Sequence, residues 1–76
     1  MNNKRRSNLK AALLYLKKAS DIVSEASDQE QDCMDNIPEN LCDTERYERM
    51  ENASDNLEDA ISLIDDAIEK IEDAST

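Results

Sequence analysis

The sequence predicts an all-α protein built as an antiparallel two-helix hairpin, and two observations support this prediction. Apolar residues recur every seven positions in two stretches, the pattern of helices that pack side by side along their length. The chain of 76 residues also has no Gly, one Pro and only two aromatic residues, so it lacks the turn and strand formers of a β-sheet. The repeating residues of the first stretch are Leu9, Leu16 and Val23, then Ala12, Ala19, Ala26 and Cys33. Those of the second stretch are Met50, Leu57, Ile64 and Ile71, then Ala53, Ala60, Ala67 and Ala74.

Alanine occupies nearly every d position of both heptad stretches, while larger apolar residues occupy the a positions. A small residue at d lets two helix backbones approach closely. We therefore expect an alanine-rich seam between the two helices.

The first helix is expected over about residues 7–36. Its start offers three side chains that can accept hydrogen bonds from free backbone N–H groups, namely Asn2, Asn3 and Ser7. Its end is set by Pro38, because the residue before a proline is disfavoured in helical backbone, and that residue is Ile37.

Residues 37–43 are expected to form the turn, in which Pro38 can begin a short helical turn. The second helix is expected over about residues 44–73, with Asp43 or Thr44 as its N-cap. A short connection between two long amphipathic helices predicts that they run antiparallel.

Residues 1–76 are expected to form a single domain, and its core is small. A chain of this length seldom gains more than about 3–5 kcal/mol from one core. Further apolar residues flank the seam, with Leu13, Ile61 and Ile68 at e and Tyr15, Ile22 and Leu63 at g. This broad apolar face predicts self-association into a four-helix or larger bundle. The alternative is that the flanking residues only widen the contact within one hairpin.

The two cysteines flank the connection between the helices. A disulfide between Cys33 and Cys42 is geometrically conceivable, but two reduced thiols fit a cytoplasmic protein better. Cys33 falls at a d position, where it is expected to replace alanine in the seam. Because the chain has no His, neither a zinc site nor a catalytic Cys–His pair is predicted.

The charges are distributed very unevenly. Residues 1–20 contain six bases and no acid, and residues 21–76 contain all nineteen acids and three bases. A basic arm suggests nucleic-acid binding. In an antiparallel hairpin, however, residues 4–18 lie beside the acidic residues 58–73, so pairing within or between subunits is favoured over direct nucleic-acid binding.

The turn end is strongly acidic, with nine acids and no base in residues 21–45. Such a segment is either a solvated surface that keeps an oligomer in solution or a docking surface for a basic partner. Rows of carboxylates on a helix can also imitate the phosphate charges of duplex DNA.

The segment around the turn is the least repetitive part of the chain. Five polar residues there are candidates for gripping a small anionic ligand or a partner loop: Asn36, Asn40, Arg46, Tyr47 and Arg49. The structural alternative is that the two asparagines close the turn and that Arg46 pairs with Asp43 or Glu39.

Residues 35–41 read D-N-I-P-E-N-L and residues 45–47 read E-R-Y. This segment, followed by an alanine-rich acidic helix, resembles a group of small acidic helical-hairpin proteins of bacteriophages and mobile elements of gut bacteria. Their shared pattern is D-N-x-P-E-N-L followed by E-R-Y. The resemblance covers most of the chain, although only the turn is distinctive. It implies a phage or mobile-element origin and no particular mechanism. Accessory proteins of that size and source often act by binding, for instance to a host defence component.

The chain lacks the groups expected of an enzyme, because it has no His, no Gly-rich phosphate loop and no nucleophile–base pair. We predict no cofactor and no metal site. No apolar run approaches the roughly 18 residues needed to span a bilayer, so no membrane interaction is predicted, and the expected location is the cytoplasm of a bacterial host.

The leading hypothesis is a non-enzymatic, oligomeric interaction protein that binds or inhibits a basic host protein through its acidic turn end. One alternative is a sponge that sequesters an anionic nucleotide signal in pockets between subunits. The other alternative is a DNA mimic that inhibits a DNA-binding protein.

Overall fold

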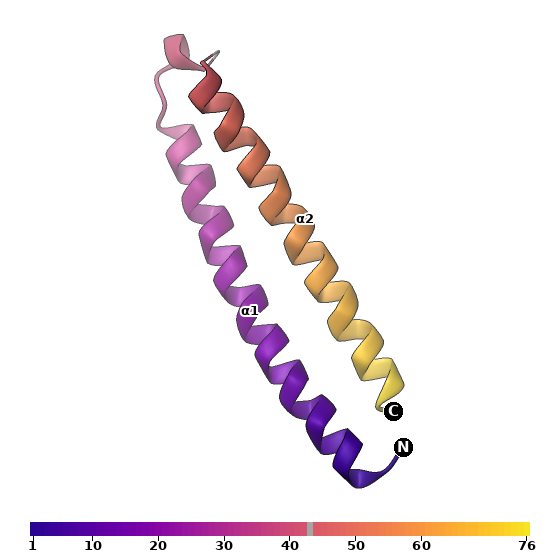
Figure 1. Ribbon diagram of the computed structural model, residues 1–76. Coiled ribbons are helices and arrows are strands. Elements are labelled where there is room, and N and C mark those ends of the chain that lie inside the picture. Colours follow the sequence, from indigo (N-terminus) through magenta and orange to yellow (C-terminus); the bar gives the residue numbers. More distant parts are fainter. Residues whose placement is uncertain (43) are drawn as a thin grey trace.

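The computed structural model describes residues 1–42 and 44–76, and it shows two long helices packed side by side in opposite directions (Figure 1). Helix α1 spans Asn3–Asp35, the short 3₁₀ helix η1 spans Glu39–Leu41, and helix α2 spans Glu45–Ala74. The rod measures 59 × 14 × 14 Å, and its radius of gyration of 17.3 Å exceeds the roughly 11 Å of a compact domain of this length. The all-helical class and the packing of two helices against each other are confirmed.

Helix α1 begins four residues earlier than expected, because Asn2 caps it. The Asn2 Oδ1 accepts a hydrogen bond from the backbone N–H of Arg5 at 2.8 Å, which satisfies one of the free donors of the first turn. At the other end, Asn36 donates both its backbone N–H and its side-chain Nδ2 to the carbonyl oxygen of Asp32, at 3.2 and 2.8 Å. These bonds satisfy a carbonyl group that the ending helix leaves open, just before Ile37 departs from the helix.

Helix α2 begins after Thr44, whose side-chain hydroxyl serves two roles. Its Oγ1 accepts from the backbone N–H of Tyr47 at 3.3 Å and donates to the carbonyl oxygen of Leu41 at 2.9 Å. The other expected cap, Asp43, lies outside the described residues. Pro38 precedes η1 as its N-cap rather than forming its first residue.

The interface between the helices contains no fully buried apolar side chain within residues 1–42 and 44–76. The only buried residues described are Ser27 and Ser54, which are 9% and 5% exposed. The apolar residues of the seam are half-buried on α1, including Leu9, Leu13, Leu16, Val23 and Met34. Those of α2 are half-buried too: Met50, Leu57, Ile61, Ile64, Ile68 and Ile71. One pair of helices encloses too little volume to exclude water from any of them.

The prediction of an alanine-rich seam between the helices is wrong in part. The d residues Cys33, Ala53 and Ala74 are exposed, whereas the e residues Ser27 and Ser54 are buried. The contact is therefore centred between positions a and e. A physical reason is that the e positions carry large residues elsewhere, and burying an Ile or Leu stabilises a contact more than burying an alanine.

Polar groups close the hairpin on the flank that carries the b positions. Lys17 Nζ lies 3.9 Å from Glu72 Oε1, and the Ser20 hydroxyl donates to Asp65 Oδ1 at 3.2 Å. Both side chains of the ion pair are more than half exposed, so the pair contributes at most about 1 kcal/mol. These contacts fix the register of the two helices more than they stabilise them.

Replacing both buried serines with alanine should stabilise the protein. The double variant Ser27→Ala/Ser54→Ala is expected to raise the free energy of unfolding by about 1–2 kcal/mol, because alanine has the higher helix propensity and no hydroxyl to desolvate. Urea denaturation followed by circular dichroism measures the change. The exposed control Ser62→Ala should gain only about 0.5 kcal/mol from propensity. An equal gain per residue at all three positions would contradict the burial argument.

Candidate functional site

The net charge of the molecule lies entirely in the half of the rod that contains the turn. In the other half, residues 1–20 carry six bases, and residues 57–76 carry seven acids and one base, so this half is neutral. Residues 21–56 carry twelve acids and two bases, which gives a net charge of −10. The hairpin therefore has a neutral end at its termini and a strongly negative end at its turn.

Five of the acids form a straight stripe along the outer face of α1. They are exposed and follow one another at intervals of four, three, four and three residues: Asp21, Glu25, Asp28, Asp32 and Asp35. This spacing keeps all five on one side of a helix, at positions c and f of the heptad, away from α2. The number of acids predicts a negative turn end, but it does not place these five on one face; their periodicity, which is visible in the sequence, does.

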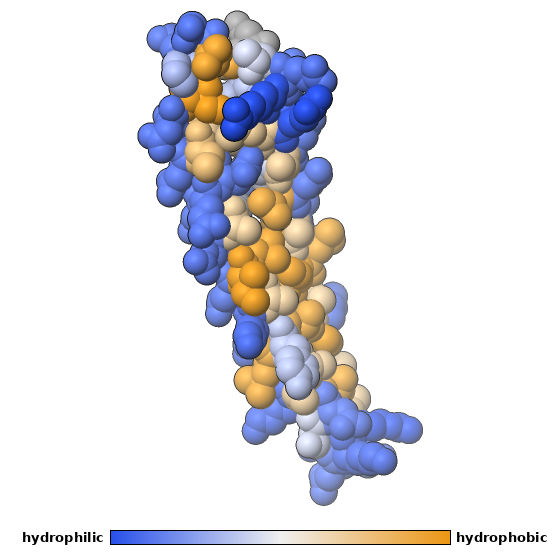
Figure 2. Space-filling view, turned by 60° about the vertical axis from the view of Figure 1, so that its left-hand side comes forward, coloured by the Kyte–Doolittle hydropathy of each residue, from blue (hydrophilic) through white to orange (hydrophobic). Residues whose placement is uncertain are grey.

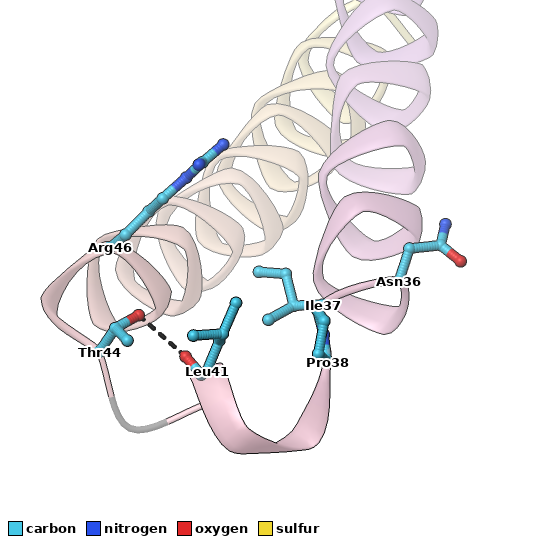
Figure 3. Close-up of a pocket in the computed structure, with 6 residues that line it drawn as sticks. All are labelled: Asn36, Ile37, Pro38, Leu41, Thr44 and Arg46. Atoms are coloured by element: carbon cyan, nitrogen blue, oxygen red, sulfur yellow. Dashed lines mark hydrogen bonds between the residues drawn. The ribbon is translucent and has the colours of Figure 1, made fainter.

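The turn end contains an open pocket with a volume of about 360 Å³. Its lining is Asn36, Ile37, Pro38, Leu41, Thr44 and Arg46. In Figure 3 the side chains of Ile37 and Leu41 point toward each other across the pocket, whereas the amide of Asn36 points away from it. The pocket is thus mainly apolar, and Arg46 is the one basic residue among those that line it.

The structure only partly gathers the five residues predicted to form a site. Asn36 and Arg46 line the pocket, but Asn40, Tyr47 and Arg49 are not part of its lining. Asn40 is exposed in η1, and Arg49 Nη2 donates to Glu45 Oε1 at 2.7 Å one helical turn away. The charge of Arg49 is therefore already paired within its own helix.

Tyr47 is half-buried where α2 begins. Its partial burial raises the pKa of the phenol above the usual value of 10.0, and the neighbouring acidic groups of Cys42, Glu51 and Asp35 raise the pKa further. The hydroxyl group of Tyr47 is neutral throughout the physiological pH range, as the ordinary pKa of tyrosine already requires. It can act as a hydrogen-bond donor but not as a base.

A second distinctive surface, which we call the apolar face, lies on the flank opposite the Lys17–Glu72 ion pair. It contains Tyr15, Ile22 and Leu63, which are 75%, 57% and 69% exposed, at g positions. Half-buried alanines at d positions border them: Ala19, Ala26, Ala60 and Ala67. Apolar side chains form a band that runs along the rod over both helices (Figure 2). A large exposed apolar surface of this kind is typical of an interaction site.

Both cysteines, Cys33 and Cys42, are free thiols. The thiol of Cys42 contacts the carbonyl oxygen of Pro38 at 3.8 Å. Residues 1–42 and 44–76 contain no group of three or more acidic, Cys or His side chains placed to hold a metal ion. Across the same described ranges, neither long helix has an apolar stretch sufficient to cross a bilayer.

Comparison of this chain with protein-family models, with curated proteins and with solved structures finds no match.

Proposed function

We propose that this chain is a non-enzymatic, self-associating interaction protein that binds a basic protein of a bacterial host through its acidic turn end. The main support is the concentration of the whole net charge of −10 in residues 21–56, with five exposed carboxylates aligned on α1. Such a field attracts positively charged surfaces and speeds their association. The resemblance of residues 35–47 to turns of phage and mobile-element proteins suggests the origin of the chain and the host as the source of the partner.

Self-association is supported by the amount of surface that a single hairpin leaves in water. The chain exposes 5966 Å², whereas a compact monomer of 8.6 kDa exposes about 4,700 Å². The excess of roughly 1,300 Å² is more than the about 800 Å² that each partner buries in a stable interface. Because no apolar residue described is fully buried, an oligomer would supply the core that the hairpin lacks.

The geometry gives less support to a nucleotide sponge. A phosphate-binding pocket needs converging bases, and within the turn pocket only Arg46 contributes one. A nucleotide that binds only the folded protein must raise its melting temperature, so a thermal shift with a panel of nucleotides tests this function. DNA mimicry by the acidic stripe is tested separately, by displacement of DNA from host DNA-binding proteins.

The proposed partner site is tested with two variants that lose the same amount of charge. The stripe variant carries Asp21→Asn, Glu25→Gln, Asp28→Asn, Asp32→Asn and Asp35→Asn. The control variant removes five exposed acids of α2, with Glu58→Gln, Asp59→Asn, Asp66→Asn, Glu69→Gln and Asp73→Asn. These five make none of the recorded contacts between the helices.

Proteins captured from a bacterial lysate are compared for the parent chain and the two variants. We expect basic proteins that bind the parent chain and the control at low salt, and that bind the stripe variant at least tenfold less. Their binding should also weaken in 0.5 M NaCl, because salt screens exposed charges. Equal capture by both variants would show that net charge alone attracts these proteins, and the proposed site would be wrong.

A further inference from the structure

We propose that the apolar face is covered by a second copy of this chain that lies antiparallel to the first, so that α1 packs on α1 about a two-fold axis near Ile22. This arrangement rests on the self-association proposed above and specifies its geometry. It would place the turn of each hairpin over the termini of the other.

Two of the three large residues of this face, Ile22 and Leu63, lie at the same height along the rod. The hydrogen bond between Ser20 and Asp65 shows which residues are level in the two helices. Moving two residues forward along α1 and two back along the antiparallel α2 leads from this pair to Ile22 and Leu63. Both are at g positions and both are more than half exposed. They therefore form one apolar cluster that spans both helices at a single level.

The long-range charges select the direction of the second copy. A parallel dimer would set one turn half of net charge −10 against another of the same charge. An antiparallel dimer sets each turn half against a neutral half whose α1 segment carries six bases and no acid. Because like charges across an interface are costly, the antiparallel direction is favoured.

In the antiparallel dimer, the basic part of α1 in each copy lies beside the acidic part of α1 in the other copy. Bases occupy residues 4–18 of this helix, and acids occupy residues 21–35. An axis level with residues 21 and 22 places Lys18 of one copy opposite Glu25 of the other, and the symmetry repeats this pair. Both side chains lie at c positions, at the edge of the apolar face. Within one copy they are seven residues apart, about 10.5 Å along the helix, so they do not pair with each other.

Cysteine cross-linking tests the position of the axis. Ile22→Cys and Leu63→Cys are introduced separately into a chain that carries Cys33→Ala and Cys42→Ala. We expect each single-cysteine variant to form a disulfide-linked dimer on mild oxidation, because each residue faces its own copy near the axis. Asp28→Cys in the same background, on the outer face of α1, should remain at least tenfold less cross-linked.

A different pairing gives a different result in this experiment. If α1 packs on α2 of the second copy, disulfides would form only when the Ile22→Cys and Leu63→Cys chains are mixed. That outcome would overturn the proposed arrangement.

Charge reversal provides a second measurement that does not depend on cysteine chemistry. Lys18→Glu or Glu25→Lys alone should weaken dimerisation about tenfold, since each change places like charges together at two symmetric positions. The double variant Lys18→Glu/Glu25→Lys restores opposite charges and should return to within about threefold of the parent. Additive weakening in the double variant would contradict the arrangement.

Sedimentation equilibrium of the parent chain separates failure of this arrangement from failure of the broader proposal. A chain that remains monomeric at every concentration would overturn both self-association and the antiparallel dimer. A dimer without the expected cross-links and without charge rescue would overturn only the arrangement. Glu25 belongs both to the acidic stripe and to this dimer contact, so lysate capture tests the stripe separately only when the stripe variant keeps Glu25.

Discussion

The variant Leu16→Asp is expected to lose most of the helical structure. Leu16 is half-buried between the two helices, and its removal forfeits about 2 kcal/mol of apolar burial. The carboxylate that replaces it must also be partly desolvated. Because a chain of this size has only about 3–5 kcal/mol of stability to lose, the unfolded form should be heavily populated at 25 °C. Circular dichroism at 222 nm and urea denaturation measure the loss.

The matched control is Leu14→Asp, two residues away on the same helix. Leu14 is 66% exposed at an f position on the outer face of α1, so this variant should remain within about 0.5 kcal/mol of the parent. The two variants have the same composition, charge and helix propensity. Equal destabilisation of both would mean that the side of α1 that packs on α2 has been wrongly assigned.

Added salt should stabilise the protein, and the melting temperature should rise by about 10 °C between 10 mM and 0.5 M NaCl. Two carboxylates 10 Å apart in water repel by about 0.4 kcal/mol, and the turn half contains twelve acids against two bases. The Debye length falls from about 30 Å to about 4 Å over this range, which removes most of that repulsion. The ion pair of Lys17 with Glu72, which salt would weaken, contributes less than the summed repulsion. A gain of 1–3 kcal/mol corresponds to a shift of this size in a small domain.

The variant Asp28→Asn/Asp32→Asn/Asp35→Asn tests how much the repulsion between acids of the turn half contributes to the effect of salt on the melting temperature. It removes three charges from the last turns of α1, where acids also oppose the helix dipole. Its melting temperature at 10 mM NaCl should exceed that of the parent, and its response to salt should be smaller. A melting temperature that falls with salt in the parent would show that attraction between the helices outweighs repulsion.

The sequence was sufficient to predict the helices, their packing and most of their ends. Heptad spacing and the absence of Gly identified two amphipathic helices, and Pro38 placed the turn. The start of α1 was predicted too late, because several polar residues can cap a helix and the sequence does not rank Asn2 above Ser7. Thr44 was one of two predicted caps, and its hydrogen bond to Tyr47 supports it.

The rotation of the seam was harder to predict, because neighbouring heptad positions differ by only a fraction of a turn. Ala53 and Ser54 are adjacent in sequence, yet the first is exposed and the second is buried. Which positions face the other helix depends on the summed burial of the large e residues along both helices. No single position shows this sum. For the candidate site, the pairing of Arg49 with Glu45 was accessible from their spacing of four residues, whereas the orientation of Asn36 away from the pocket required coordinates.

The two chain ends meet at one extremity of the rod, and the turn lies at the other (Figure 1). A fluorophore, affinity tag or fused domain joined to either terminus is therefore held up to 59 Å from the acidic tip. Immobilising the chain on a sensor through a terminal tag would hold the tip of a single hairpin away from the sensor surface. Energy transfer between labels at the two termini would report directly whether the hairpin is closed, because opening it would separate the far ends of α1 and α2.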